Sequence, residues 1–147
     1  MARPIADARQ LALTISFGVR LVNVLGDFTA LRRLLWILLD NALKYTPPLG
    51  RVEVTLSATT IKATVIVRDS GAGISEADLP HIFDRFYRAD PSRSQTEGAG
   101  LGLAIAKWIA EMHHAELTVS SRLKMGTVFQ LDVPICSEAP ILVEMSG

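Results

Sequence analysis

Three stretches of the sequence place polar or glycine residues where a protein could do chemistry. The first, LRRLLWILLDNALKYTPP over residues 31–48, carries an amide and an amine inside an apolar helical pattern. Four of its residues are spaced i, i+4, i+7 and i+8, so they share one stripe of a helix, apart from its leucine side: Ile37, Asn41, Lys44 and Tyr45. This stripe is either a functional surface or the ordinary polar face of an amphipathic helix.

The second stretch is VIVRDSGAGIS, in which a strand pattern ends on Asp69 and is followed by Gly71 and Gly73. Glycines permit a tight turn and let a flat ligand approach the backbone. A carboxylate accepts hydrogen bonds, so it can accept one from an exocyclic amine. Adenine has such an amine where guanine has a carbonyl, so Asp69 could select adenine. The alternative is an ordinary Asp-Ser-Gly turn.

The third stretch, EGAGLGLAIAKW, has Gly98, Gly100 and Gly102 at alternate positions directly before a helical pattern. Backbone N–H groups at a helix start can bind an anion when no side chain covers them. A polar loop precedes these glycines, whereas a Rossmann fingerprint requires a strand there, and the P-loop string is absent. A protein-kinase glycine loop is excluded as well, because no H-R-D or D-F-G follows.

The elements that must position these residues can be predicted from hydrophobic periodicity and turn signals. We expect a helix from a cap at Asp27 or Thr29 to about Tyr45, and a short helix with a capping-box-like start at Ser75 and Asp78. A second long helix is expected from Leu101. The predicted strands are 11–17, 19–26, 51–58, 62–69, 116–122 and 126–134.

This order of elements predicts a two-layer α/β sandwich, with a mixed sheet of about five or more strands and three helices on one face. Residues 1–10 are expected to be a linker, residues 11–134 the domain and residues 135–147 a tail. The 147 residues suit one domain, and an apolar share of 49% is enough for a hydrophobic core.

Composition also limits the partners and the compartment. Fifteen basic and fifteen acidic residues cancel, which argues against nucleic acid as a partner. Cys136 is the only cysteine, so an internal disulfide is impossible and a reducing compartment is expected. No apolar run approaches the ~20 residues that span a bilayer, and no signal peptide is evident at the start. A cytoplasmic domain is therefore expected.

Together and in this order, the motifs resemble those of the ATP-binding catalytic domain of two-component sensor histidine kinases, in the GHKL (Bergerat-fold) ATPase superfamily. LLDNALKYTP resembles the N box, DSGAGI the G1 box, IFDRFYR the F box and GAGLGLAI the G2 box, while MGTVF resembles the last glycine–threonine element. The resemblance covers residues 8–134 and implies the Bergerat fold.

The resemblance implies ATP and Mg²⁺ as cofactors. Asn41 would ligate Mg²⁺, Lys44 would contact the phosphates and Arg88 would neutralise charge near the γ-phosphate, and these three residues are the expected catalytic set. Residues 88–99 would form the ATP lid. The expected nucleotide-binding set is Asn41, Lys44, Tyr45, Asp69, Gly71, Gly73, Ile74, Tyr87, Arg88, Gly98, Gly100, Leu101, Gly102, Leu103 and Thr127.

The sequence departs from the family pattern in two respects. Ile37 stands where many members have a second asparagine and where related ATPases have a water-activating glutamate, so no base for ATP hydrolysis is evident; Asp40 points about 100° away on the helix. None of the three histidines lies in an H-E-x-x-[TN] helix start, so the phosphoacceptor is not expected here. His81 is expected in the short helix, and His113 and His114 at a helix end that favours a cation.

The resemblance implies two partners: a histidine-bearing dimerisation domain of the parent kinase and a response regulator downstream. The isolated domain is expected to be a monomer, and membrane anchoring of the parent protein stays open. Two alternatives also stay open. One is another GHKL ATPase, such as an anti-sigma-type serine kinase. The other is a nucleotide-binding or interaction module without turnover, in which Ile37 marks a degenerate site.

Overall fold

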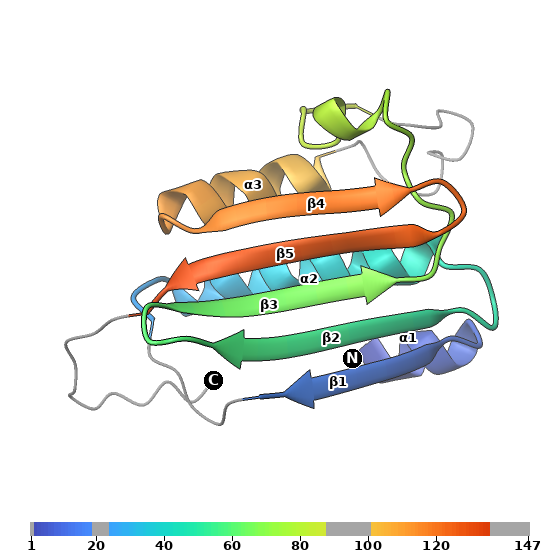
Figure 1. Cartoon of the computed structure of the whole chain (residues 1–147), viewed down its shortest axis with the longest axis horizontal. Helices are drawn as coiled ribbons and strands as arrows, with labels where there is room; N and C mark the ends of the chain where they lie inside the picture. The colour runs from blue at the N-terminus through green and yellow to red at the C-terminus, as the bar shows by residue number, and fades with distance from the viewer. Residues whose placement is uncertain (1, 19–23, 88–100, 136–147) are drawn as a thin grey trace.

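The structure is a computed structural model that describes residues 2–18, 24–87 and 101–135. Its elements, labelled in Figure 1, are α1 (Ala2–Ala8), β1 (Ala12–Phe17), α2 (Phe28–Tyr45), β2 (Arg51–Ala58), β3 (Lys62–Asp69), the 3₁₀ helix η1 (Leu79–His81), α3 (Gly102–Met112), β4 (Glu116–Arg122) and β5 (Gly126–Pro134).

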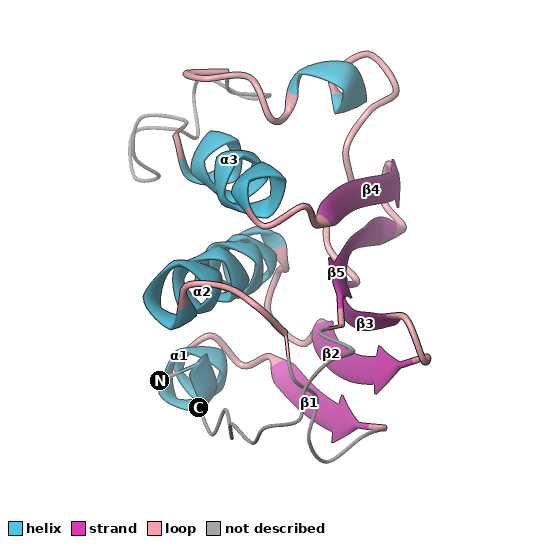
Figure 2. Ribbon diagram, turned by 90° about the vertical axis from the view of Figure 1, so that its left-hand side faces the viewer, coloured by secondary structure: helices cyan, strands magenta, loops and turns pink. Residues whose placement is uncertain are grey.

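The five strands form one mixed sheet in the order β1-β2-β3-β5-β4. β1 pairs with β2 in parallel, and every other pair is antiparallel. Figure 2 shows α1, α2 and α3 side by side on one face of this sheet. The predicted two-layer α/β sandwich with three helices on one face is therefore confirmed.

The core lies between the two layers because side chains alternate along each strand. α2 buries Leu34, Leu38 and Leu43 completely, and each such side chain contributes about 1.5–3 kcal/mol relative to exposure. From the sheet, the inward positions of β2, β3, β4 and β5 meet them. These inward residues include Val52, Val67, Leu117, Phe129 and Leu131.

Helix α2 is capped by Asp27, one of the two residues predicted for this role. The Asp27 carboxylate accepts hydrogen bonds from the backbone N–H groups of Thr29 and Ala30. These are two of the donors that a helix start leaves unpaired, so Asp27 is the N-cap. At the other end, Thr46 Oγ1 donates to the Ala42 carbonyl at 2.7 Å, and the following Pro47 cannot continue the helix.

His113 joins the end of α3 to the start of α2. Its Nε2 accepts from the Asp27 N–H at 3.0 Å, and its Nδ1 lies 2.8 Å from the Ile109 carbonyl. A nitrogen that accepts carries no proton, so Nδ1 holds the ring proton and donates it to Ile109. His113 is also the C-cap of α3, so it lies at the helix end where it was predicted.

The structure differs from the sequence-based prediction in three segments. Residues 1–10 were expected to be a linker; residues 2–8 form α1, and Ala6 lies in the core. Of the predicted strand 19–26, residues 19–23 lie outside the described part and Val24 forms only an isolated bridge to Ile135. The short helix predicted from Ser75 is the single turn η1. The Ser75 hydroxyl does accept the Asp78 N–H, as a cap would.

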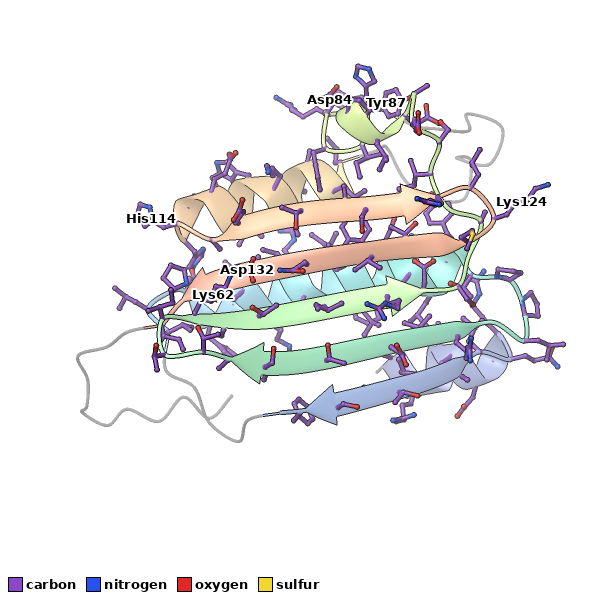
Figure 3. All side chains as sticks on the ribbon, in the orientation of Figure 1. Lys62, Asp84, Tyr87, His114, Lys124 and Asp132 are labelled. Atoms are coloured by element: carbon purple, nitrogen blue, oxygen red, sulfur yellow. The ribbon has the colours of Figure 1, made fainter. Side chains whose placement is uncertain are left out.

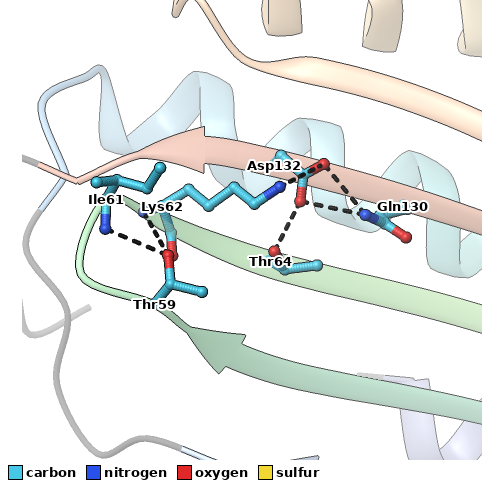
Figure 4. A network of polar contacts seen from close by, with 6 residues as sticks. All are labelled: Thr59, Ile61, Lys62, Thr64, Gln130 and Asp132. Atoms are coloured by element: carbon cyan, nitrogen blue, oxygen red, sulfur yellow. Dashed lines mark hydrogen bonds and ion pairs between the residues drawn. The ribbon is translucent and has the colours of Figure 1, made fainter.

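The sheet face away from the helices carries polar side chains (Figure 3). Around Asp132, the Thr64 hydroxyl donates to Oδ1 at 2.7 Å, while the Gln130 amide and the Lys62 ammonium approach Oδ2 at 3.1 and 3.8 Å (Figure 4). This carboxylate is thus satisfied by neighbours on the same face. None of the helices among residues 2–18, 24–87 and 101–135 is long and apolar enough to cross a membrane.

Candidate functional site

Asp69 ends β3 as a buried carboxylate. Only 7% of the residue is exposed, and Oδ1 accepts the Gly71 N–H at 2.8 Å. Burial raises the pKa of Asp69 above its ordinary value, against the opposing effect of hydrogen bonds from the Gly71 and Thr127 backbones. Thr127 lies directly opposite on β5 and is 5% exposed. A buried carboxylate therefore lies beside a buried hydroxyl at the end of the sheet.

The turn after Asp69 is pressed against two other elements, which is why it contains glycines. A Cβ on Gly71 would lie 2.4 Å from the Tyr45 carbonyl at the end of α2. Gly73 has a φ of +78°, and a Cβ there would lie 2.0 Å from the Arg122 carbonyl. The turn therefore touches both the end of α2 and the turn between β4 and β5.

Ser121 connects the same turn to Thr127. Its Oγ accepts the Ile74 N–H at 2.7 Å and lies 2.8 Å from both the Gly126 carbonyl and Thr127 Oγ1. Sequence reasoning did not find Ser121, because nothing local in ELTVSSR distinguishes it from its neighbour Ser120. We call Asp69, Gly71, Gly73, Ile74 and Thr127 the carboxylate group.

The polar stripe of α2 approaches the start of α3. Asn41 and Lys44 are half-buried, and Lys44 Nζ lies 3.2 Å from Asp40 Oδ2. Both partners of this ion pair are about one-third exposed, so its stabilising effect is small. Ile37 lies one turn before Asn41, and its Cγ2 is 3.6 Å from where a Cβ on Gly102 would stand. Asn41 is thereby placed near the α3 start.

The start of α3 has the features of an anion site. Its N-cap, Leu101, makes no side-chain capping hydrogen bond, and Gly102 is exposed. The first N–H groups of the helix are therefore not covered by a capping side chain, and the helix dipole favours negative charge there. Leu103 is half-buried and packs against the core. We call Asn41, Lys44, Leu101, Gly102 and Leu103 the helix group.

The two groups lie at the same end of the domain. In Figure 1 the end of α2, the start of α3 and the end of β3 all lie toward the right of the sheet. α2 joins them, since the Tyr45 carbonyl lies against the Gly71 turn and Ile37, one turn before Asn41, lies beside Gly102. Tyr45 itself is 37% exposed. Three other predicted site residues lie outside the described residues: Arg88, Gly98 and Gly100.

Tyr87, the F-box residue predicted to border the ligand, has its partners within its own segment. Its hydroxyl donates to Asp78, and its ring lies 5.3 Å from the His81 ring. The hydrogen bond from Tyr87 lowers the pKa of Asp78 and raises that of Tyr87. Figure 3 places Tyr87 and Asp84 on the segment that projects beyond β4 and α3. In this structure Tyr87 therefore braces its own segment.

A cavity of about 580 Å³ opens at this end of the sheet. Its lining includes Asp69, Ser121 and Thr127, but also the outward-facing Arg51 and Arg68. The helix group does not contribute to it. Asp69 and Thr127 of the carboxylate group thus border a cavity toward the open face of the sheet.

The chain belongs to a known ATPase family. The family model described as "Histidine kinase-, DNA gyrase B-, and HSP90-like ATPase" matches residues 26–136. This range contains α2 through β5, and hence both the carboxylate group and the helix group. The family assignment agrees with the mixed sheet covered by helices on one face.

Curated relatives are sensor histidine kinases. Sensor histidine kinase RppB of Synechocystis sp. is 40% identical over 134 residues, which is 90% of this chain and 30% of that protein. Sensor histidine kinase YkoH of Bacillus subtilis is 46% identical over 105 residues, which is 71% of this chain and 23% of that protein. The chain therefore spans less than a third of the length of these relatives.

Solved structures of histidine kinases share the fold. A mycobacterial sensor histidine kinase, MprB, superposes with a TM-score of 0.78 at 30% identity, covering 90% of each chain. Full-length ShkA in complex with AMPPNP also gives a TM-score of 0.78, at 29% identity, covering 93% of this chain and 28% of that one. The chain thus corresponds to the part of such kinases that carries this ATPase fold.

Proposed function

We propose that this chain is the catalytic domain of a sensor histidine kinase, which binds Mg-ATP and donates the γ-phosphoryl group to a histidine on a separate dimerisation domain. The observation that carries the proposal is the buried Asp69 carboxylate, held by the Gly71 N–H beside Thr127. The names of the relatives support the kinase class, and the AMPPNP complex of the neighbour ShkA supports ATP as the ligand.

The carboxylate group binds the adenine base. Asp69 accepts a hydrogen bond from the 6-amine of adenine, an interaction that guanine cannot make with its carbonyl. The close approach of the Gly71 turn to α2 leaves no room for a Cβ there, so the turn keeps its shape when the base binds. Ile74 is half-buried against the core and offers an apolar contact to the flat base.

The helix group binds the triphosphate and Mg²⁺. The uncapped N–H groups at the α3 start suit phosphate oxygens, and the Lys44 ammonium adds a positive charge to that side. The Asn41 amide oxygen is a hard neutral ligand of the kind Mg²⁺ accepts beside phosphate oxygens and waters. The described residues contain no cluster of three His, Cys, Asp or Glu side chains that would hold a metal alone. When bound, Mg²⁺ neutralises charge on the phosphates.

Phosphoryl transfer then depends on positioning rather than on a base from this chain. A neutral imidazole nitrogen of the partner domain attacks the γ-phosphorus as the bond to the ADP oxygen breaks. Ile37 packs toward Gly102 and has no proton-accepting group, so the chain supplies no side chain at that position to activate water. The phosphoryl group passes on to a response regulator in the parent pathway, on the cytoplasmic side.

Nucleotide binding is the first test. In a calorimetric titration, the wild-type chain is expected to bind Mg-ATP at least tenfold more tightly than Mg-GTP, because one charge-assisted hydrogen bond is gained and one acceptor clash avoided. If the folded chain binds neither nucleotide, the result would favour the alternative of a degenerate module, in which Ile37 marks a site that has lost its function.

Phosphoryl transfer is the second part of that test. Incubation with γ-labelled ATP and a dimerisation domain from a related kinase is expected to label the acceptor histidine, and label should be absent when the acceptor histidine is replaced by alanine. ATP binding without transfer to any histidine domain, including that of the parent protein, would exclude the kinase proposal and leave a binding module.

As the pH is lowered, the affinity for ATP is expected to begin falling at a higher pH than it would if Asp69 had the pKa of an ordinary aspartate. Binding needs ionised Asp69, and burial raises its pKa above 3.8, so protonation begins at a higher pH. Purine riboside triphosphate lacks the 6-amine but has the same phosphates. The ratio of its dissociation constant to that of ATP is therefore expected to shrink on acidification, as measured by calorimetry. A ratio constant with pH would contradict the role of Asp69.

A further inference from the structure

Ser121 lies at the centre of a hydrogen-bond network behind the proposed base pocket. Its Oγ is 2.7 Å from the Ile74 nitrogen, 2.8 Å from the Gly126 carbonyl oxygen and 2.8 Å from Thr127 Oγ1. It thereby contacts the Gly73–Ile74 turn, the start of β5 and Thr127 at once. Ser121 is also the cross-strand partner of Thr127.

The capacity of a hydroxyl group decides how the protons are arranged. Ser121 can donate once and accept twice. The Ile74 N–H occupies one acceptor position, and the Gly126 carbonyl can only accept. If Ser121 donated to Thr127, two oxygen acceptors would stand 2.8 Å apart without a proton between them. Ser121 therefore donates to Gly126, and its remaining acceptor position takes the proton of Thr127.

This arrangement makes Thr127 an acceptor toward its other neighbours. Its only proton is committed to Ser121, so the lone pairs of Oγ1 are what remain for a ligand. Asp69, its partner on β3, is also an acceptor. Cross-strand partners have Cβ atoms about 5 Å apart, so the two acceptors stand side by side at the end of the pocket.

We propose that Ser121 is a specificity-determining positioning residue: by holding the proton of Thr127, it makes that hydroxyl repel a purine with a carbonyl at position 6. The proposal rests on the function proposed above and deepens it, since discrimination between 6-amino and 6-oxo purines becomes shared between Asp69 and the Ser121–Thr127 pair. A Thr127 hydroxyl released from Ser121 could rotate and donate to a 6-carbonyl.

The test compares ATP with inosine triphosphate, which carries a 6-carbonyl and the same triphosphate. In Ser121→Ala the released Thr127 hydroxyl can donate to the 6-carbonyl of inosine triphosphate (ITP). The preference for ATP over ITP, given by the ratio of their affinities, is therefore expected to fall by about fivefold, which corresponds to the contribution of one hydrogen bond. Calorimetry gives both dissociation constants. Ser120→Ala is the matched control, because Ser120 is the adjacent residue on β4, is exposed and faces away from Thr127. It should leave the ratio unchanged.

A double-mutant cycle shows whether Ser121 acts through Thr127. Thr127→Val removes the hydroxyl and should itself narrow the ratio. Ser121→Ala added to Thr127→Val is then expected to change the ratio no further, and Ser121→Thr, which keeps a hydroxyl, should restore the wild-type ratio. A purely structural role for Ser121 would lower stability and weaken both nucleotides equally.

The outcomes separate this inference from the proposed function. If the wild-type chain binds neither nucleotide, the proposed function fails. If wild type prefers ATP but Ser121→Ala keeps the wild-type ratio, the inference alone is overturned. The same holds if Ser121→Ala lowers the preference for ATP as much in the Thr127→Val background as it does in wild type. Should Ser121→Ala not fold, an unchanged ratio in Thr127→Val overturns it just as well.

Discussion

Replacement of Asp69 by asparagine is expected to weaken ATP binding by about a hundredfold. A hydrogen bond to a charged acceptor contributes about 1.5–3 kcal/mol, and 1.4 kcal/mol corresponds to a factor of ten in affinity. An asparagine has one oxygen, and the Gly71 N–H already requires it. Its NH₂ group would then face the 6-amine of adenine, donor against donor. Titration of Mg-ATP into the variant measures the loss directly.

The same substitution is expected to leave the fold intact. Because burial raises the pKa of Asp69, the folded domain binds its proton more tightly than the unfolded chain. The stability that comes from this tighter proton binding is fully present below pH 3.8, the pKa of the unfolded chain's aspartate. It is lost as the pH rises through the higher pKa of Asp69 in the folded domain. At neutral pH the buried charge is therefore unfavourable, and asparagine removes it while losing one accepted bond. The free energy of unfolding should change by less than about 1 kcal/mol.

Urea denaturation of Asp69→Asn therefore belongs beside the titration. Asp84→Asn is a suitable control, since Asp84 is an exposed carboxylate whose partner is His81, within its own segment. It should bind ATP as wild type does. A folded Asp69→Asn variant with wild-type affinity for ATP would remove the basis of the adenine assignment.

Local signals in the sequence were sufficient for most of the fold. β2, β3, β4 and β5 begin and end where alternation predicts, because each has a buried face and an exposed face. α2 runs to Tyr45 as predicted, because its cap and its terminating prolines are encoded within a few residues of its ends. The Asp69 turn was predicted for the same reason.

What the sequence could not predict depends on contacts between distant residues. His113 bonds to Asp27, 86 positions away, and Ser121 bonds to Ile74, 47 positions away. No local pattern distinguishes these side chains from neighbours that face solvent. Tyr87 is a different case: its partner Asp78 is only nine positions away. The turn that joins them has no regular period, so spacing did not reveal the pair.

Gly126→Ala is expected to destabilise the domain by about 3 kcal/mol or more. Gly126 has a φ of +107°, which L-residues rarely adopt, and a Cβ there would lie 2.0 Å from the Asp69 carbonyl oxygen. The Asp69 carbonyl belongs to backbone held in the β3–β5 pair, so it cannot move cheaply. For a domain of this size the melting temperature should fall by about 10 °C, as measured by calorimetry.

Gly102→Ala tests the opposite case, a glycine that ligand binding requires and folding does not. At Gly102 a Cβ would meet only Ile37 Cγ2 at 3.6 Å, an ordinary contact, and alanine favours a helix over glycine by up to about 1 kcal/mol. The unliganded variant should therefore be as stable as wild type or more so, yet bind ATP less tightly, because the new methyl group stands beside the N–H groups proposed to bind phosphate. A Gly102→Ala variant with wild-type affinity would move the phosphates away from the α3 start. A Gly126→Ala variant with wild-type stability would mean that β3 and β5 can separate at Asp69, and the rigid carboxylate on which adenine selection depends would lose its support.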